Sequence, residues 1–468
     1  MNSDTVIIPT NGAPQPGEEA SPALPGAVTS GDLRRAAWAA SLGSALEYYD
    51  FALYNLAAAL VFGPLFFPSA NPALGVIASF ATFFVGFAAR PFGGIIFGIL
   101  GDRYGRKFVL IATLLLMGTS STLIGVLPTY ATAGIWAPIL LVFLRVMQGL
   151  GAGAEQAGAA ILMAEYAPPA RRGYYAALPL GGVMLGSAGA ATIYLLVLAG
   201  IGDPANSYVW RFPFLFSVVI IATAFWVRLR LKESPSFARL EARQQVDQRP
   251  LRNLLAGSRR PLLTVIGLRI GEGSASAIYQ SLAISYMVTV TGLGARIGIF
   301  ALLASSTTGA LMTWFAGRLS DRFGRVPMYR LYAVTQLALA FPVWWALSQG
   351  NQALSITALS IALLPVWGML GTQGAFLPEL FGARHRYVGV AMGREIAAMT
   401  AGGLSPLIGA FIIAFMAGRG DAGLAWIPLA AYVVAATCIT LATILVTPET
   451  RGRDLDALCD APRQARAP

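Results

Sequence analysis

The sequence predicts an all-α polytopic membrane protein with twelve transmembrane helices, arranged as two six-helix bundles. Composition, the length of the apolar runs and the placement of the cations all predict this class. Of the 468 residues, 56% are hydrophobic and 12% are charged, whereas a soluble protein carries about 25% charged residues. A helix needs roughly 20 apolar residues to cross a bilayer, and about twelve runs of that length recur along the chain.

The apolar runs form two sets of six. The first set is expected at 37–62, 74–100, 107–127, 136–164, 174–200 and 210–230. The second set is expected at 261–289, 296–317, 327–347, 353–377, 387–416 and 425–446. The predicted organisation is a disordered tail (1–35), a bundle (36–230), a cytoplasmic linker rich in Arg, Gln and Glu (231–260), a second bundle (261–447) and a cytoplasmic tail (448–468).

The cations are distributed unevenly between the predicted loops. The net charge is +11. Of the 33 Lys and Arg, 26 fall in alternate loops and in the two tails, and four lie within helices (Arg90, Arg145, Arg269 and Arg394). Only Arg211, Arg296 and Arg419 fall on the opposite side. This asymmetry is the positive-inside rule, so we expect both termini in the cytoplasm of a bacterium, the bilayer as partner, and no nucleic acid. The two cysteines indicate no disulfide framework.

Two similar loops occupy equivalent places in the two sets. The first, Gly-Ile-Leu-Gly-Asp-Arg-Tyr-Gly-Arg-Lys at 98–107, follows the second predicted helix. The other, Gly-Arg-Leu-Ser-Asp-Arg-Phe-Gly-Arg at 317–325, follows the eighth. Their matching positions indicate an internal repeat.

These loops resemble the signature loops of the major facilitator superfamily, and the second departs from the pattern at Val326, where a basic residue is usual. Further segments resemble one branch, the metabolite:proton symporters, which contains shikimate, 2-oxoglutarate, citrate and betaine carriers. They are Glu-Tyr-Tyr-Asp-Phe at 47–51, Ala-Arg-Pro-Phe-Gly-Gly at 89–94, Leu-Arg-Val-Met-Gln-Gly at 144–149, Trp-Arg-Phe-Pro-Phe at 210–214 and Lys-Glu-Ser-Pro at 232–235. The resemblance runs from about 34 to 450.

The resemblance implies secondary active transport by alternating access, in which a monomeric unit carries a small organic acid or zwitterion together with a proton. A carboxylate is the expected substrate, and the proton is the expected coupling ion, with sodium left open as the alternative and no cofactor. Two alternatives are a proton-coupled drug efflux antiporter and a transport-inactive sensor of the same fold. The branch resemblance argues against the first, and the intact Asp50, Arg145 and Asp102 argue against the second.

Enzyme and metal chemistry find no support in the sequence. Gly-Leu-Gly-Ala-Gly at 149–153 lies inside an apolar run, so it predicts close helix packing rather than a phosphate loop. The single histidine, His385, excludes a His-rich metal site or proton relay. We therefore expect no metal, and a proton carried by carboxylates.

The first helix supplies candidates for that proton. Glu47 and Asp50 are spaced i,i+3 and share a helix face, at a depth where a carboxylate costs several kcal/mol unless it is paired, protonated or hydrated. Arg90 and Glu155 are expected at a similar depth. Two carboxylates competing for one arginine would make a proton switch, whereas the alternative is a static buried salt bridge. Asp50 is the first choice as carrier, and Glu47 and Glu155 are the others.

Arg145 is the principal candidate for substrate binding, because its guanidinium cannot deprotonate and must face water, an anion or a carboxylate. Gln148 shares its face, and Tyr54 shares the face of Asp50. By the resemblance, the helices that hold these residues line the central cavity. The alternative is that Arg145 pairs with a carboxylate of the first helix.

Two further charged pairs lie in the second bundle. Arg269 and Glu272 are spaced i,i+3 in the seventh helix and could bind substrate. Arg394 and Glu395 adjoin in the eleventh helix, point about 100° apart, and complete the intramembrane charge network. The alternative is that the two pairs neutralise one another between the seventh and eleventh helices.

The repeated loops are expected to act as gates. By the resemblance, Asp102 caps the positive N-terminus of the eleventh helix and holds the cytoplasmic side shut. The remaining loop candidates are Arg103, Arg106, Asp321, Arg322 and Arg325.

Overall fold

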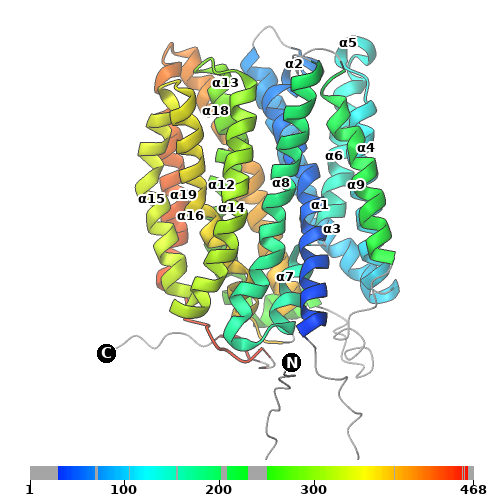
Figure 1. The fold of residues 1–468 in the computed structure, drawn as a ribbon, viewed down its shortest axis with the longest axis vertical. Coiled ribbons are helices and arrows are strands. Elements are labelled where there is room, and N and C mark those ends of the chain that lie inside the picture. Colours follow the sequence, from blue (N-terminus) through cyan, green and yellow to red (C-terminus); the bar gives the residue numbers. More distant parts are fainter. Residues whose placement is uncertain are drawn as a thin grey trace, which may run out of the picture.

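A computed structural model describes residues 30–68, 72–104, 106–153, 156–201, 208–229, 250–383, 385–455, 457 and 459–461. The regular secondary structure of these residues is helical, and the long helices stand side by side in one bundle (Figure 1). The start of α1 and the end of α19 lie at the same end of the bundle (Figure 1). We call it the cytoplasmic end, following the prediction from the charges.

The first half of the bundle is built from seven longer helical segments among the described residues. They are α1 (Ser30–Leu60), α3 (Pro72–Tyr104), α4 (Arg106–Val126), α6 (Trp136–Ala152), α7 (Gln156–Tyr166), α8 (Arg172–Ile201) and α9 (Arg211–Leu229). Short segments join them: α2 (Phe62–Phe66), α5 (Tyr130–Ala133) and η1 (Pro169–Arg171).

The second half follows a short helix, α11 (Pro250–Gly257), at the cytoplasmic end. Its helices are α12 (Arg259–Ala277), α13 (Ala283–Thr289), α14 (Ala295–Phe323), α15 (Arg325–Ser348), α16 (Gln352–Leu380), α17 (Arg386–Ala397), α18 (Leu404–Gly418) and α19 (Trp426–Leu445). The π-helical turns η2 (Ile278–Leu282) and η3 (Ala398–Gly403) join α12 to α13 and α17 to α18, and η4 (Ala422–Leu424) precedes α19.

Each predicted transmembrane segment coincides with one of these helices or with consecutive ones. Among the described residues, seven helices are long and apolar enough to cross a membrane by length and composition alone. Two of the helices outside this group carry buried charges. Helix α1 contains Glu47 and Asp50, and α12 contains Arg269 and Glu272. Backbone groups in a bilayer must be satisfied within the helix, so these charged segments remain helical.

Small residues set the packing of α3 against α6. A Cβ added to Gly149 would lie 2.1 Å from the carbonyl oxygen of Gly86, and one added to Gly153 would lie 2.0 Å from that of Arg90. Only glycine permits backbones to approach so closely. The glycines at 149–153 therefore serve helix packing, as the sequence predicts.

The two halves pack against each other along two seams. Helix α8 runs along α14, and α3 packs against α17, η3 and α18. One apolar core continues across the interface and includes Tyr54 and Trp210 of the first half with Tyr279 and Trp344 of the second. Buried charged residues lie close to these seams.

Candidate functional site

Arg145 is completely buried in the first half and is held by uncharged groups. Its Nη1 donates to Oε1 of Gln148 at 2.6 Å, its Nη2 donates to the carbonyl of Phe83 at 3.3 Å, and its guanidinium lies 3.7 Å from the centroid of the Tyr54 ring. Its Nε has no hydrogen-bond partner in the part of the chain that the structure describes. Among the described residues, no carboxylate pairs with Arg145, so the alternative of a salt bridge to the first helix is wrong.

Asp50 lies on the side of α1 that faces α4 and α9. Its Oδ1 accepts a hydrogen bond from the hydroxyl of Ser217 at 2.7 Å, and Ser121 supplies a second hydroxyl contact. No Lys or Arg among the described residues forms an ion pair with it. Asp50 and Tyr54 therefore act in different surroundings, although they lie one turn apart on α1: Tyr54 stacks under Arg145, and its hydroxyl lies 2.5 Å from that of Thr82.

A second group of charges joins the two halves. Arg90 of α3 donates from Nε to Oε2 of Glu395 at 2.6 Å and from Nη2 to its Oε1 at 3.3 Å. The same Nη2 lies 4.0 Å from Oε1 of Glu47. The rings of Phe51 and Phe87 lie 5.0 and 5.4 Å from the guanidinium carbon. Arg90 is thus shared between one carboxylate of each half.

The centre of the second half holds a polar network around Arg269. Arg269 lies 3.4 Å from Glu272 and donates to Oε1 of Gln373 at 2.5 Å. The Gln373 amide in turn donates to Glu272 at 3.2 Å and to the hydroxyl of Tyr329 at 2.9 Å. The hydroxyl of Tyr329 donates to the carbonyl of Leu268 at 2.7 Å. Every member of this network touches another.

The alternative of neutralisation between the seventh and eleventh helices holds only in part, because Glu395 pairs elsewhere whereas Arg394 stays near Glu272. Arg269 and Glu272 form an ion pair within α12, and Glu395 of α17 turns instead to Arg90 of the first half. Arg394 is buried on a different side of α17 and lies within electrostatic range of Arg269 and Glu272. Adjacent residues on a helix point about 100° apart, which is why these two neighbours face different helices.

The repeated loop of the second half contacts the first half at the cytoplasmic end. Asp321 accepts from the backbone N–H groups of Gly173 and Tyr174 at 2.7 and 2.9 Å, so it caps the N-terminus of α8 in the other half. Arg325 donates to Asp321 at 2.9 Å and binds Glu379 through two nitrogens at 3.1 and 3.2 Å.

The side chain of Arg322 forms no ion pair with the described residues of the first half. Its side chain is exposed and lies 5.3 Å from the ring of its neighbour Phe323.

Two ion pairs cross between the halves beside this cap. Arg172 of α8 binds Glu379 of α16 at 3.1 Å, and Arg386 of α17 binds Glu165 of α7 at 3.1 Å. The first pair is almost completely buried, whereas the Glu165 side chain is 32% exposed. The sequence contained a signal for both: Glu precedes Arg by seven positions in each half, and this spacing repeats the internal duplication.

Some predicted residues lie outside the description. Glu155 is not among the described residues. The backbone of Asp102, Arg103 and Arg106 is helical, but their side chains are not among those described. Their predicted coupling and gating roles remain predictions.

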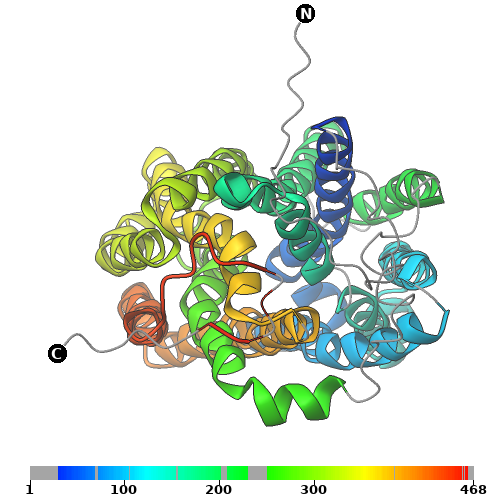
Figure 2. The ribbon, with the colours of Figure 1, turned by 90° about the horizontal axis from the view of Figure 1, so that it is seen from below.

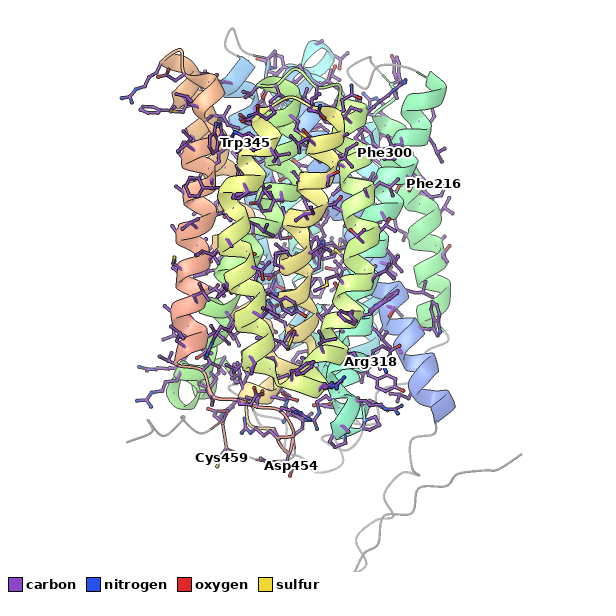
Figure 3. All side chains as sticks on the ribbon, turned by 60° about the vertical axis from the view of Figure 1, so that its left-hand side comes forward. Phe216, Phe300, Arg318, Trp345, Asp454 and Cys459 are labelled. Carbon is purple, nitrogen blue, oxygen red and sulfur yellow. The ribbon has the colours of Figure 1, made fainter. Side chains whose placement is uncertain are left out.

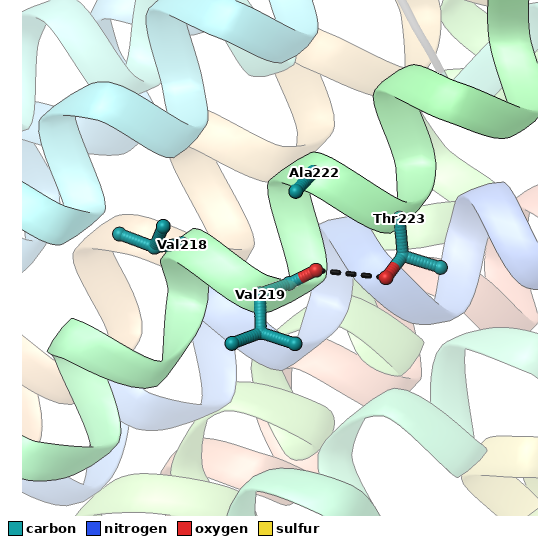
Figure 4. A pocket seen from close by; sticks show the side chains of 4 residues that line it. All are labelled: Val218, Val219, Ala222 and Thr223. Carbon is teal, nitrogen blue, oxygen red and sulfur yellow. Dashed lines mark hydrogen bonds between the residues drawn. The ribbon is translucent and has the colours of Figure 1, made fainter.

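A shallow groove on the outer face of α9 is lined by Val218, Val219, Ala222 and Thr223 (Figure 4). The Thr223 hydroxyl donates to the Val219 carbonyl of its own helix at 2.8 Å. None of the predicted site residues lines this groove, and an apolar hollow on a transmembrane helix is suited to lipid chains.

Comparisons with known proteins agree with this architecture. The sequence profile of the Major Facilitator Superfamily matches residues 40–397. The shikimate transporter of Escherichia coli (strain K12) is 36% identical over 426 residues, which cover 89% of this chain and 95% of the relative. The proline/betaine transporter of the same organism is 32% identical over 397 residues, covering 82% and 79%.

A solved structure of the proton:xylose symporter bound to 6-bromo-6-deoxy-D-glucose shares the fold. The TM-score is 0.71 at 16% identity, over 92% of this chain and 98% of the other. The relatives and the apolar helices identify a multi-pass protein of the bacterial inner membrane, and a transporter rather than an enzyme. The chain belongs to the major facilitator superfamily.

Proposed function

We propose that the protein is a proton symporter that moves a small metabolite bearing a carboxylate group across the inner membrane by alternating access. The observation that carries this proposal is Arg145. A buried guanidinium stays charged, and leaving it uncompensated in a low-dielectric interior costs several kcal/mol. A substrate carboxylate would supply the missing negative charge and could use the unbonded Nε.

The named relatives support a carboxylate rather than a particular compound. Shikimate, proline and betaine differ in ring, size and net charge, but each carries one carboxylate. The relatives are described as transporters of these solutes.

Asp50 is the proposed proton carrier. Its partners are the hydroxyls of Ser217 and Ser121, and it has no ion pair with any basic residue among those described. A membrane-buried carboxylate in such surroundings lacks a neutralising cation, so a bound proton can take that role.

A short chain of contacts leads from the proposed proton site to the proposed substrate site. Ser121 lies beside Asp50, and its hydroxyl donates to the Met117 carbonyl at 3.1 Å and accepts from the Gln148 amide at 2.8 Å. Gln148 in turn accepts from Arg145 at 2.6 Å. A change of charge at one end alters the hydrogen bonds along a contiguous network. All of these residues belong to the first half, so this half alone could couple proton binding to substrate binding.

The crossed ion pairs support alternating access. Arg172–Glu379 and Arg386–Glu165 link the halves at the cytoplasmic end, together with the Asp321 cap. For substrate to leave on that side, these bonds must separate as the halves rotate about the central site.

Thermal unfolding of the purified protein with a panel of metabolites tests the proposal, because a ligand that binds the native state raises its stability. Each acid should be paired with its methyl ester, which keeps the shape and removes the charge. We expect shifts with the acids alone, and none in Arg145→Gln.

Equal shifts with acid and ester would refute the role of Arg145. Shifts with lipophilic cations alone would favour the alternative, a drug exporter.

A further inference from the structure

The chain continues past α19 and turns back beneath the bundle. The described residues of 447–461 cross under the helices at the cytoplasmic end (Figure 2). Asp454 and Cys459 lie below the ends of the helices (Figure 3). We call these described residues the C-terminal strap.

The strap is anchored on the second half at its beginning. The carboxylate of Glu449 accepts from the backbone N–H groups of Arg325 and Val326 at 2.9 and 3.0 Å, which caps the N-terminus of α15. The hydroxyl of Thr450 donates to Oε2 of Glu379 at 2.8 Å.

Its later residues are fixed to the same half by backbone hydrogen bonds. The N–H of Ala383 donates to the carbonyl of Ala457 at 2.9 Å, and the N–H of Ala461 donates to that of Leu380 at 3.1 Å. The side chain of Arg386 also donates to the carbonyl of Leu455. These bonds make the strap part of the second half.

Two contacts reach the first half. Nη1 of Arg172 donates to the carbonyl of Arg453 at 2.8 Å. The side chain of Leu455 is 7% exposed and is buried in one cluster with Ala164 of α7, Ala176 of α8 and Ala375 of α16. Leu455 thus sits in a pocket of alanines to which both halves contribute.

We propose that the C-terminal strap is a latch that holds the cytoplasmic end closed. It moves with the second half, and its catch is Leu455 together with the Arg453 carbonyl. If the halves separate at this end, Leu455 must leave Ala164 and Ala176, and Arg172 must lose the Arg453 carbonyl. The latch therefore favours the closed state by the free energy of these contacts, whatever solute the protein carries.

Two variants release the catch. Ending the chain after Gly452 removes Arg453 and Leu455 but keeps the Glu449 cap and Thr450. Leu455→Asp keeps the full chain and places a charge in the alanine pocket. Leu455→Met is the conservative counterpart, because it preserves apolar volume. Leu424→Asp is the matched control, since Leu424 is 51% exposed and precedes α19, at the opposite end from the strap.

Distances between the halves provide the measurement. Spin labels would be attached at Ala170→Cys and Arg330→Cys, two exposed positions at the cytoplasmic end of different halves, with Cys438 and Cys459 replaced by Ser. Pulsed electron–electron resonance in nanodiscs then reports the closed and open populations. No substrate is required, so the outcome is independent of the proposed function.

We expect both catch variants to raise the open-to-closed ratio about tenfold, which corresponds to about 1.4 kcal/mol. Leu455→Met and Leu424→Asp should leave the distribution unchanged. A distribution for Leu455→Asp that matches the parent protein would overturn the proposal, as would an equal change in Leu424→Asp. If the shortened chain does not fold, Leu455→Asp decides alone.

Discussion

The centres of the two halves each bury an arginine, but the protein neutralises only one of them among its described residues. Arg269 lies between Glu272 and Gln373, so its charge is balanced within the second half. Arg145 has Gln148, a backbone carbonyl and the Tyr54 ring as partners, and none of these carries a negative charge. Nε of both arginines is buried without a hydrogen-bond partner among the described residues. The two centres therefore differ in charge compensation: Arg269 has a carboxylate beside it, whereas Arg145 has none among the described residues.

Removing Arg145 should have the largest effect. Hydrogen bonds to a charged group contribute about 1.5–3 kcal/mol each, so Arg145→Ala should reduce uptake about 100-fold or more while expression and folding are retained. Arg145→Lys should rescue little, because a point charge does not replace the planar fork. Initial uptake rates in proteoliposomes provide the measurement. Normal transport by Arg145→Ala would show that substrate binding needs neither Arg145 nor its uncompensated charge. The proposed difference in function between Arg145 and Arg269 would then be wrong.

Asp50→Asn should separate exchange from accumulation. The amide mimics the protonated carboxyl permanently, so substrate should still exchange across the membrane but should not accumulate against a gradient. Counterflow and proton-driven uptake, measured in the same proteoliposomes, distinguish the two activities. Retained accumulation would move the proton site to Glu47, Glu155 or Glu272. Loss of both activities would give Asp50 a structural role.

Gln148→Glu should make the first centre resemble the second. The new carboxylate would stand 2.6 Å from Nη1 of Arg145, where the amide oxygen lies now, and would neutralise it from within. We expect substrate affinity to fall about tenfold or more, which corresponds to about 1.4 kcal/mol. Equilibrium binding measures this, and Gln148→Asn, which adds no charge, is the control. Unchanged affinity in Gln148→Glu would show that the charge of Arg145 is not what binds substrate.

The smallest effect on stability is expected when both members of the Arg269–Glu272 ion pair are replaced together by uncharged residues. Breaking a buried ion pair costs about 3–5 kcal/mol, whereas replacing both partners is often nearly neutral. Arg269→Gln and Glu272→Gln should each lower the unfolding temperature, and the double variant should recover most of it. A double variant with parental stability but no substrate binding would instead give Arg269 and Glu272 a direct role in recognition.

The helices were predictable because a bilayer leaves few choices. An apolar run such as 353–377 has to be helical to satisfy its backbone, and the observed helix is α16, Gln352–Leu380. The twofold repeat was likewise predictable from the similar loops at 98–107 and 317–325. Asp321 and Arg325 do form contacts at the cytoplasmic end, whereas the side chain of Arg322 is exposed. The gating role of all three residues stays a prediction.

The pairing of buried charges was not predictable in the same way. Glu395 and Arg394 differ by one position, so a rotation of α17 by about 100° would exchange their surroundings. Helix rotation is set by packing with α3 and α12, which depends on side chains along the whole helix. Gln373 and Ser217 were missed because a single polar residue in an apolar run does not reveal its partner.

The two crossed ion pairs at the cytoplasmic end have a bearing on how such a chain could arise. In each half, a glutamate and an arginine seven positions apart bind their counterparts in the other half rather than each other. A single six-helix ancestor with the same spacing would have presented a self-complementary face. Two copies of it would have joined as a twofold dimer through two identical bonds. Gene fusion would then have freed the copies to differ, and the buried Arg172–Glu379 and the more exposed Arg386–Glu165 would be the present remnants of that symmetry.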